Sequence, residues 1–255
     1  MQANARPSSN AETLALRTRY RQELNCQIVH DFIHRRPGWT LTYLLQVDGV
    51  DAGFGSLAVG GPWKDKPALL EFYVLPEYRT RIFDLFEALL EVTAARFIEI
   101  QSNEPLLAAM LHTYARDVVS EKIVFHDGQT TTLPSGGATL RCVTSDEDTQ
   151  RALDERQGGP EWLLELDGQE AGKGGILFHY NRPYGDVYME IDEPLRRRGL
   201  GAWLVQELKR AAYELGAMPC ARCSPENIAS RRTLQKAGFT PFAHMLTGEI
   251  IPGRS

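Results

Sequence analysis

The spacing of apolar residues divides the chain into short helices and strands. Apolar residues recur at helical spacing across residues 12–35, which predicts one long amphipathic helix ended by Pro37-Gly38. Residues 39–47 and 52–59 alternate around the turn Asp48-Gly49, a pattern typical of a β-hairpin. The pattern further predicts strands at 68–74, 97–101 and 118–125 and helices at 82–95 and 105–115.

A second set of elements follows in nearly the same order. Gly, Ser, Thr and Pro are concentrated in residues 128–137, which marks a linker. Beyond it the pattern predicts strands at 139–143, 162–166, 170–179, 186–191, 218–223 and 242–250 and helices at 146–155, 202–215 and 227–236.

The two sets can be laid over one another. The sequence DGVDAGFG at 48–55 parallels DGQEAGKG at 167–174, so we expect duplication of a whole domain. The expected parts are a disordered leader at 1–10, a first domain at 11–127, a linker at 128–137 and a second domain at 138–255.

Composition narrows the class of protein. With 255 residues, of which 43% are hydrophobic and 24% charged, the chain is typical of a soluble globular protein of one or two domains. A net charge of −5 argues against a general nucleic-acid binder. Because no apolar run approaches the roughly 18 residues that span a bilayer, we expect a cytoplasmic protein without membrane contact.

The candidate chemistry centres on the sequence RRRGLG at 196–201, between a predicted strand and a predicted helix. Gly199 and Gly201 let the backbone approach an oxyanion, and the free N–H groups at a helix start favour negative charge. A tight turn with a solvated basic edge explains the hexapeptide equally well. In the first half, Ile82 and Asp84 occupy the glycine positions, so only the second half is expected to bind a pyrophosphate.

Cysteine and histidine pairs give weak signals for a metal. Cys220 and Cys223 form a CxxC without a second ligand pair, so we interpret them as small buried strand residues. His30 and His34 are spaced as in zinc-protease helices, but the intervening acid is Asp rather than Glu and no third ligand is apparent. No metal site is expected.

Residues 138–250 resemble the GNAT superfamily of acyl-CoA-dependent N-acyltransferases. The family's Q/R-x-x-G-x-G/A loop is matched by Arg196, Gly199 and Gly201, and its second motif by Asn227, Ser230 and Gly238-Phe239. The resemblance implies an α/β (α+β) protein of two tandem GNAT-like domains, the first degenerate. Each would have a mixed, mostly antiparallel twisted sheet with flanking helices and a splayed pair of parallel strands.

The resemblance also implies a site for acetyl-CoA or another acyl-CoA between the splayed strands, here within 188–191 and 220–224. Backbone groups near Met189 and Ile191 would pair with the pantetheine, Asn227 would contact it, and Ser230 is a further expected cofactor-binding residue. The pyrophosphate would meet the loop, which comprises Arg196, Arg197, Arg198, Gly199, Leu200, Gly201 and Ala202. Two further arginines, at 231 and 232, either reach the phosphates or form a solvated face.

The chemistry that the family implies is direct attack of an amine on the thioester, with a base for its proton. Where many members carry a Tyr as the acid that protonates the thiolate, this chain has Leu234, and the usual base positions are Val187 and Gly185. Glu190 is the candidate catalytic residue if a strand bulge turns it toward the site. Asp186 shares its face, and Tyr188, Tyr184, His179 or a water relay stay open.

We therefore expect an N-acyltransferase that acts on a primary amine of a small molecule or peptide, as a monomer or homodimer. The first domain would complete the acceptor cleft or buttress the second domain. One alternative is a non-catalytic acyl-CoA sensor or scaffold, which the absence of the usual acid and base favours. The other is an acyl or aminoacyl transferase that uses a carrier other than free CoA.

Overall fold

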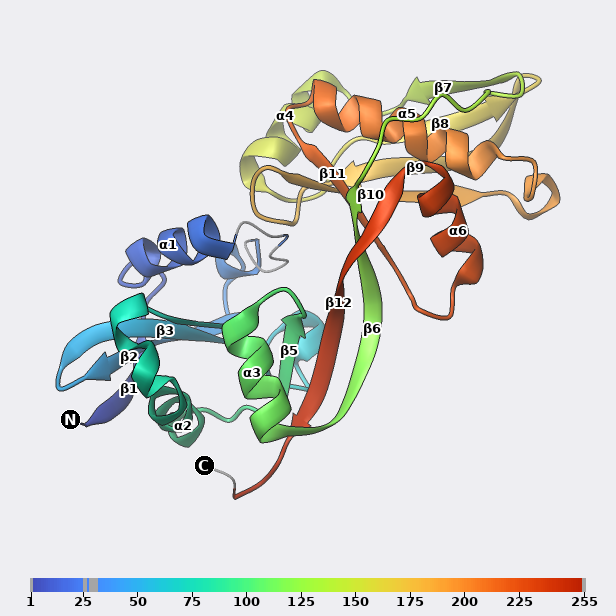
Figure 1. The fold of residues 1–255 in the computed structure, drawn as a ribbon. Helices are drawn as coiled ribbons and strands as arrows, with labels where there is room; N and C mark the ends of the chain where they lie inside the picture. Colours follow the sequence, from blue (N-terminus) through green and yellow to red (C-terminus); the bar gives the residue numbers. More distant parts are fainter. Residues whose placement is uncertain (1, 25–26, 28–31, 254–255) are drawn as a thin grey trace. The chain divides into compact units, whose positions relative to one another are not determined.

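The computed structural model describes residues 2–24, 27 and 32–253. The chain forms two compact units (Figure 1). The first comprises Met1–Cys26, Ile33–Glu121 and His244–Ser255, and the second comprises Gln27–Phe32 and Lys122–Ala243. Each unit therefore contains segments that are far apart in the sequence.

In its described residues, the first unit is a mixed sheet with three helices. Its strands follow the order β1-β2-β3-β4-β5-β12, all antiparallel to their neighbours except β4 and β5. The strands are β1 (Ala3–Ser8), β2 (Thr40–Val47), β3 (Val50–Ala58), β4 (Ala68–Val74), β5 (Phe97–Gln101) and the end of β12 (Phe239–Ile250). The helices are α1 (Leu14–Leu24), α2 (Ile82–Val92) and α3 (Pro105–Tyr114).

The second unit repeats this plan. Its order is β7-β8-β9-β10-β11-β6, and here β10 and β11 form the parallel pair. The strands are β7 (Ala138–Cys142), β8 (Glu161–Leu166), β9 (Gln169–Leu177), β10 (Tyr184–Ile191), β11 (Met218–Cys223) and the end of β6 (Ala115–Asp127). The helices are α4 (Asp146–Glu155), α5 (Leu200–Glu214) and α6 (Ile228–Lys236).

The common strand order agrees with duplication of one domain, but the closing strands are exchanged. Residues 245–249 of β12 pair with β5 in the first unit, whereas residues 123–126 of β6 pair with β11 in the second. The compact units consequently differ from the domains expected from the sequence, at 11–127 and 138–255 with a linker at 128–137. Hydrophobic alternation marks a strand but does not say which sheet edge it joins.

Two local expectations near the N-terminus also differ from the structure. Where a disordered leader was expected, residues 3–8 form β1, because their backbone pairs along β2 from Ala3–Val47 to Ser8–Thr42. Within the helix expected at 12–35, the described residues form α1 over Leu14–Leu24 and a 3-10 turn over Ile33–Arg35. His30 and Cys26 lie outside the described residues.

The core of the second unit fixes which way β10 faces. Helix α5 covers one face of β9 and β10 (Figure 1), and its buried Leu204 and Leu208 pack with Val187 and Ile191. The pairing of β9 with β10 runs from Asp186 to Ile191 without a register shift. Side chains therefore alternate regularly, and the even-numbered residues of β10 point to the face away from α5.

Candidate functional site

The site lies where β10 and β11 part. Their parallel pairing covers only three positions, from Tyr184–Met218 to Asp186–Cys220, and every residue of both strands is described. Beyond Asp186, β10 continues to Ile191 along β9 alone among its described neighbours. An open strand edge leaves backbone N–H and C=O groups that a ligand can pair with.

A large cleft opens beside this free edge. Its volume is about 760 Å³, within the range of small-molecule sites. It is lined by Met189, Glu190, Ile191, Leu195, Arg196, Arg197, Gly199, Leu200, Gly201, Ala202, Asn227, Ala229, Ser230, Arg232, Thr233 and Lys236. Four of these residues are basic and only Glu190 is acidic, so the cleft suits an anionic ligand.

The expected phosphate turn is built as a helix start. Gly199 is the N-cap of α5 with a φ of 88°, a left-handed conformation that favours glycine. Arg197 also has a positive φ, of 66°. The first turn of α5 contains no acidic residue, so its unpaired N–H groups and the helix dipole both favour an anion.

Three consecutive arginines behave differently in this turn. The Nε of Arg196 donates to the carbonyl of Ile191 at 2.9 Å, as the Nε of Arg79 donates to Val74 at 3.1 Å in the first unit. Arg196 therefore braces the turn as well as lining the cleft. Arg197 and Arg198 are both exposed, but only Arg197 lines the cleft. The other residues expected at the cofactor all line it.

Lys236 is a basic cleft residue that the sequence analysis did not identify. It lies at the end of α6, one turn after Arg232, and both line the cleft. The i, i+4 spacing of Arg232 and Lys236 was the available signal, because such residues share one face of a helix. Without the position of α6, however, this face could not be told from a solvated one.

Asn227 has a structural role at the same place. Its Oδ1 accepts a hydrogen bond from the N–H of Ser230 at 3.0 Å and so caps α6. The side-chain NH₂ group of Asn227 is then the part suited to donate toward a ligand in the cleft.

A second, smaller cavity continues from the cleft into the gap between the strands. Its volume is about 240 Å³, and it shares Met189 and Ser230 with the cleft. Its lining comprises Leu177, Asp186, Val187, Tyr188, Met189, Val205, Arg222, Ser230 and Leu234. Because Val205 belongs to α5 and Asp186 faces away from it, the cavity is lined from both faces of the sheet.

Charged groups gather at the closed end of this gap. The Nε of Arg222, on β11, donates to Oδ2 of Asp186 at 3.1 Å. Nε2 of His179 lies 3.3 Å from the same oxygen and 3.2 Å from Nη2 of Arg222. Burial opposes the charge on Arg222, but Asp186 outweighs it and raises the pKa of the guanidinium. Oδ1 of Asp186 is buried without a hydrogen-bond partner.

The other candidate acids and bases are less well placed. Burial, and then a hydrogen bond of 2.8 Å to Glu161, raise the pKa of Tyr188, so its phenol stays protonated. Glu190 is exposed and lines the outer cleft but not the inner cavity. No register shift turns it toward the gap. Leu234, at the position where the resemblance implies a tyrosine that acts as the acid, lines the inner cavity.

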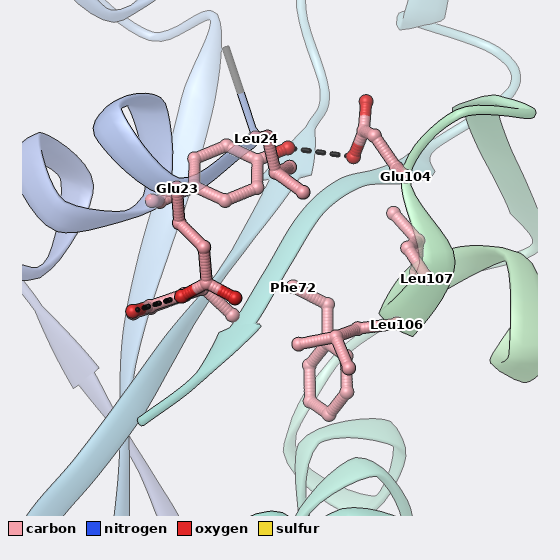
Figure 2. Close-up of a pocket in the computed structure, with 8 residues that line it drawn as sticks. Glu23, Leu24, Phe72, Glu104, Leu106 and Leu107 are labelled. Carbon is pink, nitrogen blue, oxygen red and sulfur yellow. Dashed lines mark hydrogen bonds between the residues drawn. The ribbon is translucent and has the colours of Figure 1, made fainter. Parts of the chain in front are cut away.

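The first unit has filled the equivalent space with its own side chains. Through the strand registers, Phe72 corresponds to Met189, and Glu104 precedes α3 as Asn227 precedes α6. The cavity there is only about 10 Å³, room for roughly one water. Figure 2 shows Phe72, Glu104 and Leu107 around it. At the helix start, Asp84 pairs with Arg81.

Two buried carboxyls in the first unit have pKa values shifted in opposite directions. Glu104 accepts a hydrogen bond from the phenol of Tyr20 at 2.6 Å (Figure 2), but burial raises its pKa to about 8. Burial alone would also raise the pKa of Glu71, yet His34, Arg17 and Arg21 hold it well below its usual range.

Neither a metal centre nor a membrane helix is found in the part of the chain that is described. Within residues 2–24, 27 and 32–253, no three His, Cys, Asp or Glu side chains gather as a metal would require. Cys220 and Cys223 are buried in β11, as the sequence predicts. No helix among these residues is long and apolar enough to cross a bilayer.

Comparisons with known proteins agree with this geometry. Residues 135–239 match the sequence model of the acetyltransferase (GNAT) family, a stretch that contains β10, α5, β11 and α6. A comparison with curated protein sequences gave no match.

Solved structures are similar over nearly the whole chain. An acetyltransferase of the GNAT family from Colwellia psychrerythraea has a TM-score of 0.73 at 15% identity, over 97% of this chain and 100% of that one. A tandem GNAT protein from the clavulanic acid biosynthesis pathway has a TM-score of 0.62 at 14% identity, over 99% and 100%. A GCN5-related N-acetyltransferase from Sphaerobacter thermophilus has a TM-score of 0.60 at 15% identity, over 98% and 96%.

These identities are low, so the similar structures establish the fold, whereas the family model identifies residues 135–239 directly. The chain therefore has the fold of a tandem GNAT protein, and its residues 135–239 form a domain of the GNAT acetyltransferase family.

Proposed function

We propose that the second unit transfers an acyl group from acetyl-CoA, or another acyl-CoA, to a primary amine. The observation that carries the proposal is a basic cleft at a helix start that continues into a gap through the sheet. A long anionic donor suits the cleft, and its reactive end suits the gap. The acceptor would be an amine on a small molecule or peptide, and the protein would act in the cytoplasm.

Each part of the donor would meet chemistry suited to it. The pyrophosphate would bind the N–H groups at the start of α5, with Arg197, Arg232 and Lys236 supplying positive charge. The pantetheine amides would pair with the free edge of β10 near Met189 and Ile191. A backbone N–H on this edge would also stabilise the oxyanion that forms when the amine attacks.

The first unit would have a supporting role. Its small cavity and the acidic Asp84 at the start of α2 both oppose binding of an acyl-CoA there. We infer one donor site in each chain, in the second unit.

The experiment is an acetyl-transfer assay with acetyl-CoA and a panel of primary amines that includes spermidine, lysine, ethanolamine and a peptide with a free N-terminus. Release of free CoA that depends on one of these amines supports the proposal, and mass spectrometry identifies the product. The Gly199→Glu variant serves as the inactive control, because a carboxylate would enter the phosphate site. Tight binding of acetyl-CoA without transfer to any amine would favour the sensor or scaffold alternative.

A further inference from the structure

Asp186 holds an unusual position in the second unit. It is the last residue of β10 that pairs with β11, and its side chain is only 6% exposed. Arg222 donates to its Oδ2, while its Oδ1 is buried without a hydrogen-bond partner, and the residue lines the gap. A buried carboxylate oxygen without a donor is costly, so this oxygen is suited to receive an N–H or O–H from a ligand.

The orientation of Asp186 separates it from the donor cleft. Met189 and Ile191 line the cleft, and Ile191 faces the α5 core, whereas Asp186 and Tyr188 point to the opposite face of the sheet. The gap connects both faces. An amine that approaches from the face of Asp186 therefore meets a thioester in the gap from the side opposite α5, with Asp186 beside it.

Resting on the proposed acyl transfer, we propose that Asp186 is the catalytic residue for both proton steps. The neutral amine attacks the thioester carbon and forms the C–N bond, which leaves a positively charged nitrogen. Oδ1 of Asp186 accepts one proton from this nitrogen. When the intermediate collapses, the C–S bond breaks and the departing thiolate takes that proton from Asp186, which restores the carboxylate. Amine and acyl-CoA thus become amide and CoA thiol, with no other reactant.

This assignment accounts for the missing acid at position 234. Leu234 lines the same gap but has no proton to give, and the phenol of Tyr188 is held on Glu161. Glu190 lies in the outer cleft. Among the described residues that line the gap, Asp186 is thus the one carboxyl. It lies where β10 and β11 part, a position from which it can take a proton from the nitrogen and then give it to the sulfur.

Arg222 and His179 act through Asp186 as positioning residues. Arg222 holds Oδ2, and His179 lies against the same oxygen and the same guanidinium, so these contacts fix the orientation of the carboxylate. The ring of Phe32 packs on His179 with centroids 5.9 Å apart, and the ring of Tyr180 lies 4.5 Å away. These contacts restrict the imidazole and, through it, the carboxylate.

The test measures acetyl transfer from acetyl-CoA to hydroxylamine, a nucleophile small enough to need no acceptor recognition. Asp186→Asn keeps an oxygen for Arg222 and nearly the same volume, so we expect the acetyl-CoA dissociation constant to stay within about threefold of wild type. Because general acid–base catalysis contributes about 10²–10⁴-fold, kcat should fall at least about 100-fold. Glu170→Gln, an exposed carboxyl on β9, is the matched control and should leave kcat unchanged.

The outcomes separate this inference from the proposed function. If wild type transfers acetyl groups and Asp186→Asn does so within threefold, the assignment is wrong and acyl transfer stands. If Glu190→Gln loses acetyl transfer while Asp186→Asn keeps it, Glu190 is the catalytic residue and the assignment to Asp186 is wrong. If wild type binds acetyl-CoA but does not accelerate transfer to hydroxylamine or any amine of the panel, both proposals are wrong.

If Asp186→Asn does not fold, the His179→Gln variant provides the test. Its kcat should fall about tenfold with the KM for acetyl-CoA unchanged. An unaltered kcat would contradict the catalytic role of Asp186.

Discussion

At the scale of single residues, the basic side chains near the turn divide into those that line the cleft and those that do not. Arg197, Arg232 and Lys236 line it, Arg196 also braces the turn, and Arg198 lies outside it. The sequence predicted the turn itself because glycine and arginine next to a helix start are a local pattern. It could not distinguish the three arginines, because their directions depend on the backbone of the turn.

We predict that Lys236→Ala and Arg197→Ala each weaken acetyl-CoA binding about five- to tenfold, because each removes a charge-assisted contact with a phosphate. Arg198→Ala, which removes the same charge outside the cleft, should change the dissociation constant less than twofold. Titration calorimetry at low and moderate salt measures all three variants. An effect of Arg198→Ala as large as that of Arg197→Ala would contradict this division.

Glu104 gives a second prediction at this scale. Its folded pKa of about 8 exceeds its ordinary value of 4.5, so the folded protein holds a proton there that the unfolded chain releases between these pH values. This contribution to stability is complete below pH 4.5 and is lost as the pH rises toward 8. Between these pH values the free energy of unfolding falls by at most about 1.4 kcal/mol per pH unit through this group.

Glu104→Gln should remove this slope, since the glutamine carbonyl can still accept from Tyr20 but does not titrate. Urea unfolding at pH 5, 6.5 and 8 should show that the variant loses less stability than wild type as the pH rises. Glu87→Gln, which also removes a carboxylate that accepts from a tyrosine, is the control. Parallel curves for wild type and Glu104→Gln would contradict the raised pKa.

At the scale of elements, local signals set the helices and strands, and tertiary contacts set the site. Helix α4 spans the predicted residues 146–155, because Ser145 caps it and three acidic residues follow in its first turn. The gap could not be derived in this way. Asp186 and Arg222 come from different strands and His179 from the segment before β10, and alternation gives the face of each residue but not where the strands part.

Asn227 at the start of α6 allows its two roles to be separated. Asn227→Asp retains an oxygen that caps the helix but replaces the NH₂ donor by a negative charge, so binding of acetyl-CoA should weaken with little change in thermal stability. Asn227→Ala loses the cap and should also lower stability by about 1 kcal/mol. Thermal unfolding and calorimetry distinguish the two. Equal destabilisation in both variants would contradict the capping role.

At the scale of the whole molecule, each unit is completed by a strand from the other half of the sequence. Residues 123–126 of β6 pair with β11, and residues 245–249 of β12 pair with β5. The repeat itself was visible in the sequence through the paired turns at 48–55 and 167–174. The exchange was not, because a strand's own pattern does not name its partner.

The exchange predicts how fragments behave. A fragment of residues 138–255 lacks β6, which pairs with β11, and it lacks β5, which pairs with the end of β12. Because two strand edges are then unpaired, the fragment should aggregate or unfold without cooperativity. A fragment of residues 115–243 keeps β6 and most of the second unit and should melt more cooperatively. Circular dichroism on heating compares them. Cooperative folding and full acetyl-CoA binding by 138–255 would contradict the exchange.

At this scale we predict that the chain has a single donor site, in the second unit. Calorimetric titration of the full chain with acetyl-CoA tests this most directly, with Gly199→Glu and Asp84→Ala measured beside wild type and their folding checked by thermal unfolding. We predict one bound acetyl-CoA per chain, no binding to Gly199→Glu, and unchanged binding to Asp84→Ala. Two sites per chain, or binding lost in Asp84→Ala and kept in Gly199→Glu, would contradict the assignment.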